Sequence, residues 1–92
     1  MVHFLAHGKN DNVAVAVVDV KSGEACECLN MESGERFTIN AGMDIPLGHK
    51  IALRDFTPDD TIIKYDNDIG RVVAPIQKGR HVHVQNVKTK RW

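Results

Sequence analysis

The sequence predicts an all-β domain, and three observations support this prediction. Apolar residues alternate with polar ones or form short β-branched runs, and turn-forming residues separate these runs every few positions. No window carries apolar residues at helical spacing over enough length for a helix. The chain has 92 residues, the size of one domain, so we expect a single β-rich unit.

The first predicted strand is the β-branched run from Val13 to Val18, which follows the turn-forming residues between Gly8 and Asn12. Later runs are shorter, and each ends at glycine, proline or paired polar residues. The predicted strands cover residues 13–18, 24–29, 35–39, 50–53, 61–65, 69–74 and 81–87. Residues 33–34, 46–48, 58–60 and 78–79 are the predicted turns between them.

A weak internal repeat lies within these turns. Each copy places an apolar residue three positions before a glycine or aspartate, and a β-rich run follows. The copies are Val20-Lys-Ser-Gly23, Ile45-Pro-Leu-Gly48, Phe56-Thr-Pro-Asp59 and Ile76-Gln-Lys-Gly79. Glycine and aspartate tolerate the left-handed backbone of such turns, and the leading apolar residue can hold the turn against the core. We therefore expect a repeated fold-building device.

Composition narrows the class of protein. Hydrophobic residues make up 42% of the chain and twelve basic residues balance twelve acidic ones, which favours a globular domain without a nucleic-acid or membrane partner. No apolar run approaches the roughly 18 residues of a membrane helix, so we expect a cytoplasmic protein. Cys26 and Cys28 should share one strand face and remain reduced.

Histidines carry the strongest functional signal. Alternation along residues 81–85 predicts that His81, His83 and Gln85 share one strand face, where two imidazoles can bind a metal or an anion. His49 follows Gly48 in a turn that a ligand can approach closely. A strand with a solvent-exposed polar face and a solvated turn would produce the same pattern. The alternative that these histidines have no functional role therefore stays open at this point. Nucleophile-elbow, P-loop and dinucleotide-binding motifs are absent from the sequence.

Several segments together resemble the SAF domain of the altronate and galactarate dehydratase family. They span nearly the whole chain: Asp11-Asn-Val-Ala-Val-Ala16, Asp44-Ile-Pro-Leu-Gly-His-Lys-Ile-Ala-Leu53, Ile63-Lys-Tyr65, Asp68-Ile-Gly-Arg71 and Gly79-Arg-His-Val-His-Val-Gln-Asn86. In that family the domain either begins a long polypeptide or is a separate small subunit. The length and the C-terminal segment of this chain are most similar to the small subunit of sulfolactate sulfo-lyase. Gln85 departs from the family pattern, which often has a third histidine there, and Asp59, Asp60 and Asp66 occupy turns that usually contain glycine.

The resemblance implies a β-clip (SAF-like) fold over residues 1–87, followed by a basic tail over residues 88–92. It also implies a lyase that removes water or sulfite from a hydroxy acid, with a large catalytic subunit as partner. The cofactor would be a divalent metal, Fe2+ first among the choices, held mainly by that large subunit, so we assign no metal ligand to this chain. Trp92 in the basic tail would anchor the interface.

The residues expected to act in the site follow from these motifs. We assign catalytic roles to His49, His81 and His83, and substrate-binding roles to His7, Lys50 and Asn86. Lys50 lies next to His49, where it could pair with a substrate carboxylate. One alternative is a non-catalytic SAF module that binds a carbohydrate acid or a protein. Another is a homo-oligomer that builds a site from histidines of neighbouring copies.

Overall fold

The structure, a computed structural model, describes residues 1–83 and 85–89. It confirms the all-β prediction, because nine short strands and no helix occur in these ranges. The strands are β1 Phe4–Ala6, β2 Val13–Ala16, β3 Ala25–Asn30, β4 Arg36–Asn40, β5 Lys50–Ala52, β6 Thr61–Lys64, β7 Asn67–Val72, β8 His81–Val82 and β9 Val87–Thr89. Accordingly, no described helix is long and apolar enough to cross a membrane.

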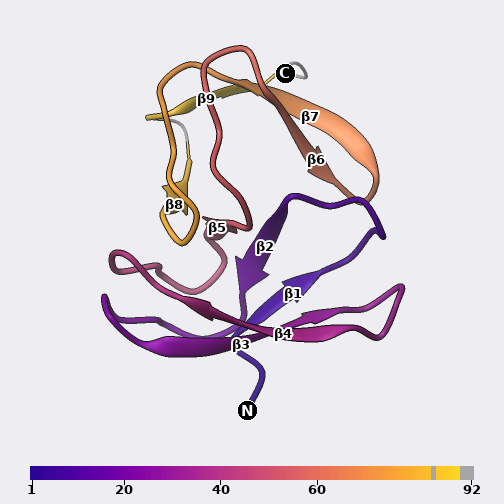
Figure 1. The fold of residues 1–92 in the computed structure, drawn as a ribbon, viewed down its shortest axis with the longest axis vertical. Coiled ribbons are helices and arrows are strands. Elements are labelled where there is room, and N and C mark those ends of the chain that lie inside the picture. The colour runs from indigo at the N-terminus through magenta and orange to yellow at the C-terminus, as the bar shows by residue number, and fades with distance from the viewer. Residues whose placement is uncertain (84, 90–92) are drawn as a thin grey trace.

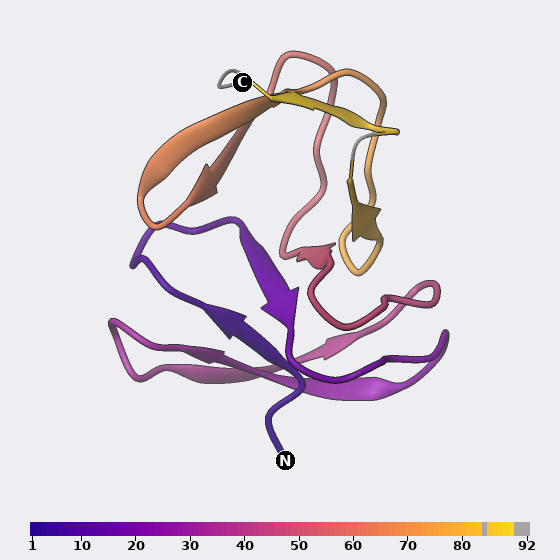
Figure 2. The ribbon, with the colours of Figure 1, turned by 180° about the vertical axis from the view of Figure 1, so that it is seen from behind.

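Two sheets divide the molecule into a larger and a smaller layer (Figure 1). The larger sheet has the strand order β4-β3-β1-β2-β5-β8, and the smaller has the order β6-β7-β9. Only the β1–β3 pair is parallel among the strand pairs of the described residues. Seen from behind, β5 and β8 lie between the curved sheet formed by β1 to β4 and the smaller sheet (Figure 2).

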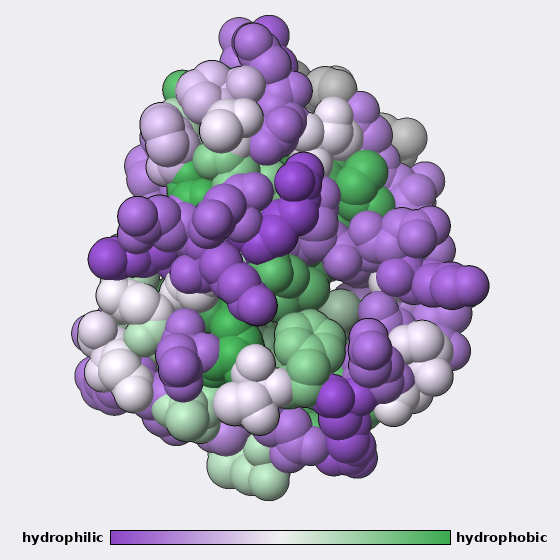
Figure 3. Space-filling view, in the orientation of Figure 1, coloured by the Kyte–Doolittle hydropathy of each residue, from purple (hydrophilic) through white to green (hydrophobic). Residues whose placement is uncertain are grey.

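Each layer encloses its own group of apolar side chains. Phe4, Val20 and Ile45 belong to the core of the larger sheet, and Phe56 and Ile76 belong to the core beneath the smaller one. The face of the molecule seen in Figure 3 is largely hydrophilic, and its apolar side chains gather mainly near the centre of the view. Burial of these side chains is the main source of stability in so small a domain.

The four repeat turns behave as the sequence predicts. Their final residues, Gly23, Gly48, Asp59 and Gly79, all have positive φ angles, between 78° and 89°. Their leading residues, Val20, Ile45, Phe56 and Ile76, are at most 3% exposed. These leading residues also pair through isolated antiparallel bridges, Val20 with Ile45 and Phe56 with Ile76. The repeat therefore joins the turns in pairs and attaches each pair to a core.

Aspartates immediately before the apolar residues fix the first pair of turns. The backbone N–H of Leu47 donates to Asp19 at 2.9 Å, and the N–H of Ser22 donates to Asp44 at 2.8 Å. Each aspartate thus holds the turn that faces it. In the second pair, the N–H of Lys78 donates to Asp55 at 2.8 Å, but Pro75 occupies the fourth aspartate position.

Three strand predictions need correction. Phe4–Ala6 forms β1, which the sequence analysis missed because three residues are too few to show a period. The predicted strand over residues 81–87 is wrong, since β8 ends at Val82 and a turn follows before β9. The strand predicted from residue 69 begins earlier, at Asn67. In the last two cases hairpin geometry, which depends on tertiary contacts, determined the boundaries.

The expected boundary between domain and basic tail falls inside β9. Lys88 pairs with Arg71 and Thr89 pairs with Gly70, so the first tail residues extend the smaller sheet. Trp92, the expected interface anchor, lies outside the described residues.

Candidate functional site

Two of the repeat turns place histidines beside each other. Gly48 ends one turn and His49 follows it, while Gly79 ends another and leads into β8 at His81. The strands after these turns pair antiparallel, with Ile51 opposite His81. Because neighbouring strands of a sheet lie about 5 Å apart, residues at these positions are within side-chain contact. The site therefore arises from the fold-building repeat itself.

His49, His81 and His83 form what we call the three-histidine cluster. Nδ1 of His49 lies 2.8 Å from Nε2 of His81. The ring centroids are 5.0 Å apart for His49 and His81, 4.5 Å for His49 and His83, and 5.3 Å for His81 and His83. One ring nitrogen from each residue lies within 4.8 Å of the other two. The structure thus brings together all three residues assigned catalytic roles.

His83 reaches the cluster from a turn and not from a strand face. The amide nitrogen of Asn86 donates to the carbonyl of His81 at 2.8 Å, and the backbone N–H of His83 donates to the amide oxygen of Asn86 at 3.0 Å. The N–H groups of Asn86 and Val87 both donate to the carbonyl of His83. Asn86, expected to bind substrate, therefore has its amide engaged in holding the two histidines in place.

Gln85 contacts the outer side of the cluster. Its amide nitrogen lies 3.2 Å from Nδ1 of His81, the ring nitrogen that does not face His49. A hydrogen bond at this nitrogen fixes the orientation of the imidazole and decides which ring nitrogen carries the proton. The residue that replaces the family's third histidine thus supports His81 from behind.

The electrostatics of the site favour the neutral form of His81. Burial, and then the neighbouring His49, His83 and Lys50, lowers the pKa of His81 from its ordinary value of 6.5. A neutral ring offers a nitrogen lone pair, which a protonated ring does not. Burial, and then the charge of Lys64, lowers the pKa of Lys50. Lys50, expected to bind substrate, is thus close enough to the cluster to influence its charge.

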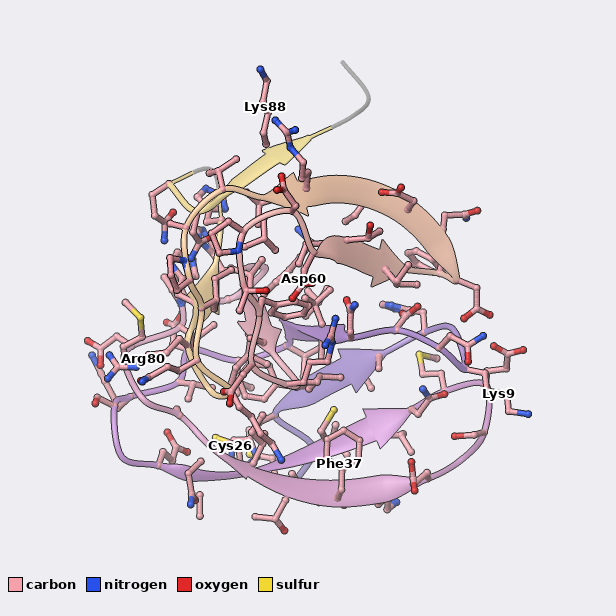
Figure 4. The ribbon with its side chains drawn as sticks, turned by 45° about the horizontal axis from the view of Figure 1, so that its top comes forward. Lys9, Cys26, Phe37, Asp60, Arg80 and Lys88 are labelled. Atoms are coloured by element: carbon pink, nitrogen blue, oxygen red, sulfur yellow. The ribbon has the colours of Figure 1, made fainter. Side chains whose placement is uncertain are left out.

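His7 lies on the other side of the molecule. Its ring stacks on Tyr65 at a centroid distance of 4.3 Å, and its Nδ1 is buried with no hydrogen-bond partner among the described residues. The loop after β1 lies opposite β8 in Figure 1, and in Figure 4 Lys9 of that loop lies at the edge opposite Arg80. The structure therefore does not unite His7 with the residues of the cluster.

A second group of possible metal ligands has a structural explanation. His3, Glu24 and Cys26 offer ligand atoms within 4.8 Å of one another. Nδ1 of His3 accepts the backbone N–H of Glu27 at 3.0 Å, and its Nε2 lies 3.2 Å from the Glu24 carboxylate. Burial, and then the charge of Glu24, raises the pKa of Cys26 and disfavours the thiolate that would bind a metal. Both ring nitrogens of His3 are therefore already used.

The two cysteines match their prediction. Cys26 and Cys28 are buried, free, and two positions apart on the same strand. Burial raises the pKa of Cys28 to about 12, so it has little nucleophilic character at neutral pH.

The sequence analysis missed one residue of the site. Arg80 precedes His81 and lines a pocket beside it, together with Gln85 and Asn86. The sequence offered one indication of a role for Arg80, namely its position between Gly79 and the candidate site residue His81. It was not used because lysines and arginines in turns are usually exposed to solvent.

The fold and the cluster together define a small β-clip-like domain that presents a polar site from paired turns. The chain belongs to the altronate/galactarate dehydratase SAF domain family, whose model matches residues 2–90. It is 46% identical over 92 residues to "(2R)-sulfolactate sulfo-lyase subunit alpha" of Chromohalobacter salexigens, an alignment that covers 99% of this chain and 98% of that one.

Two further relatives agree with this assignment. The protein of the same name from Paracoccus pantotrophus is 46% identical over 65 residues, which cover 71% of this chain and 97% of that sequence. Altronate dehydratase of Bacillus subtilis is 37% identical over 89 residues, 97% of this chain but 17% of the relative. The same kind of domain thus occurs both as a whole small chain and as a minor part of a long one.

Proposed function

We propose that this chain is the small subunit of a cytoplasmic hydroxy-acid lyase and completes an active site with a large catalytic subunit. The observation that carries the proposal is the three-histidine cluster, because it places three imidazoles at one exposed edge of a domain too small for a deep site of its own. Family membership, and relatives named as lyase subunits over almost the same length, support it. The substrate would be a sulfonated or sugar-derived hydroxy acid that loses sulfite or water.

The donor set of the cluster suits a divalent transition metal. Imidazole nitrogens bind such metals at about 2.0–2.1 Å, so ligands of one ion lie roughly 3 to 4 Å apart. The nitrogens of His49 and His81 are 2.8 Å apart, and all three nitrogens lie within 4.8 Å of one another. Small side-chain rotations would bring them into range. Although the sequence led us to expect no metal ligand in this chain, we now propose that the cluster contributes ligands and the large subunit supplies the rest, with Fe2+ the first candidate.

Gln85 would select the tautomer of His81, because its amide can either donate to Nδ1 or accept a hydrogen bond from it. With its amide nitrogen facing Nδ1, the proton of His81 resides on Nε2 and points towards His49. Rotating the amide by half a turn would present its oxygen instead, move the proton to Nδ1 and free Nε2.

Elimination from a hydroxy acid requires removal of the proton beside the carboxylate, which builds negative charge on the carboxylate oxygens. A bound divalent ion would stabilise that charge. Lys50, half-buried and next to His49, would bind the carboxylate. His83 is the most exposed ring of the cluster, so it is the best placed to donate a proton to the departing group. We leave His7 outside this site.

Reconstitution tests the proposal. The purified chain alone should show no turnover, and it should restore activity when mixed with its large subunit and ferrous iron. His49→Ala, and the double variant His81→Ala with His83→Ala, should lower the rate of the complex at least about a hundredfold while the fold is retained. His3→Gln serves as a matched control because both ring nitrogens of His3 have partners outside the cluster.

Two results would contradict the proposal. Full activity of the large subunit alone would remove any catalytic contribution by this chain. Wild-type rates in the cluster variants would leave the alternative of a non-catalytic binding module, which requires a ligand but no partner enzyme.

A further inference from the structure

A pocket of about 360 Å³ opens beside the three-histidine cluster. Met43 and Ile76 contribute its apolar wall, and Arg80, His81 and Gln85 contribute polar groups. His81 belongs to both the pocket and the cluster, so a molecule in this pocket would lie next to the imidazoles. The volume falls within the range of small-molecule sites and suits an acid of a few carbons.

Arg80 provides the positive charge of this pocket. Four arginines lie within the described residues, and Arg36, Arg54 and Arg71 each have a carboxylate oxygen within 4.0 Å. No such partner occurs for Arg80 in the described part of the chain. Its guanidinium therefore lines the pocket without an internal counter-charge, and Figure 4 shows the residue at the outer edge of the molecule.

Backbone hydrogen bonds fix the main chain of Arg80, and its side chain packs against Gly42. The N–H of Arg80 donates to Gln77 at 3.0 Å, and its carbonyl accepts the N–H of Ala52 at 2.9 Å. A Cβ atom at Gly42 would lie 2.9 Å from Nε and 3.1 Å from Cδ of Arg80. Only a residue without a side chain lets the arginine stem lie this close, so Gly42 and Arg80 are sterically matched.

We infer that Arg80 anchors the terminal anionic group, a carboxylate or a sulfonate, of the small acid that this pocket binds. The guanidinium can form two parallel N–H···O bonds to either group, a geometry that lysine does not offer. This inference rests on the proposed function in one respect, namely that the bound acid also reaches the histidines. It gives Arg80 a role in binding the substrate.

The test uses the full chain and NMR signals of the Arg80 side-chain Nε–H and the Gly42 amide. Titration with sulfolactate or altronate should shift both signals, whereas neutral glycerol and equal concentrations of sodium chloride should not. Arg80→Gln should weaken acid binding about tenfold or more, and Arg80→Lys should recover only part of the loss. Arg71→Gln is the matched control, since its guanidinium lies on β7 and pairs with Asp59.

Gly42→Ala provides an independent variant, because it displaces Arg80 without removing its charge and should also weaken binding. Equal affinities in wild type and Arg80→Gln, or no shift of the Arg80 signal by either acid, would overturn the inference. A parallel titration with Co2+, monitored on the ring signals of the three histidines, tests the proposed metal site separately. Metal binding without acid binding would contradict the inference about Arg80 and leave the proposed metal site intact. Acid binding without metal binding would support the inference about Arg80 and contradict the proposed metal site.

Discussion

Nδ1 of His49 and Nε2 of His81 lie 2.8 Å apart, although 32 positions separate the two residues in the sequence. One residue follows a repeat turn closed by Gly48, and the other follows the turn closed by Gly79. Pairing of β5 with β8 brings the two turns to one edge of the larger sheet. The repeat turns therefore both stabilise the fold and bring the histidines of the candidate site together. Substitutions in these turns should affect stability and the site.

Gly79→Ala should be strongly destabilising. The φ angle of Gly79 is 89°, and an added Cβ would lie 2.4 Å from the carbonyl oxygen of Asn40. Backbone strain and this overlap together should cost more than about 2 kcal/mol in the free energy of unfolding, measured by urea denaturation. Gly34→Ala is the control, since its φ is 75° but nothing lies within 4 Å, and it should cost about 1 kcal/mol. Equal losses would show that backbone conformation alone matters.

Asn86→Ala should loosen the turn that carries His83. The variant removes the donor to the His81 carbonyl and the acceptor for the His83 N–H, at an expected cost of about 1 to 3 kcal/mol in unfolding free energy. Asn86→Asp keeps the acceptor only and should be intermediate. Metal affinity, measured by calorimetry, should fall with stability in both variants. Unchanged affinity in Asn86→Ala would mean that the histidines do not depend on this amide.

Gln85→Ala should lower the affinity of the cluster for Co2+ or Fe2+ by about 10- to 100-fold, because His81 would lose the hydrogen bond that orients its ring. Gln77→Ala removes an amide from the neighbouring pocket and should leave metal affinity unchanged. Titrations monitored by absorption of bound Co2+ provide the measurement. If the two variants bind alike, Gln85 has no supporting role.

Asp11 should make stability depend on acid pH. Burial raises its pKa, but hydrogen bonds from the backbone N–H groups of Asp66, Gly8, Tyr65 and His7 outweigh this effect, and the net pKa is below the ordinary 3.8. The folded state thus binds this proton less readily than the unfolded state does. The stabilisation is present above pH 3.8 and is lost as the pH falls through the lowered pKa.

The variant Asp11→Asn provides the check. It should be less stable than wild type by about 1 to 3 kcal/mol at neutral pH, because an amide replaces a carboxylate that accepts several N–H groups. Urea unfolding at decreasing pH should show this difference shrinking below the ordinary aspartate pKa. A constant difference would indicate a steric effect and not a titration.

Local sequence patterns were sufficient to predict those features that depend on a single residue type and its intrinsic backbone preference. The positive φ angles at Gly23, Gly48 and Gly79 were predictable because glycine adopts that backbone conformation without steric cost. The shared strand face of Cys26 and Cys28 followed from their spacing of two residues. By contrast, β1 was missed, and residues 81–87 were taken as one strand, because short strands and hairpin ends depend on their partners.

The sequence by itself determined an all-β domain of short strands, its family, its four repeat turns and the identity of the candidate histidines, since periodicity and turn chemistry are local. Only the tertiary structure decided which of these residues meet. It joined His49 to His81 and His83, separated His7 from them, turned Asn86 inwards as a support and revealed Arg80 beside a pocket. The physical reason is that strand pairing between distant segments fixes these distances, and the spacing of residues along the chain does not specify which strands pair.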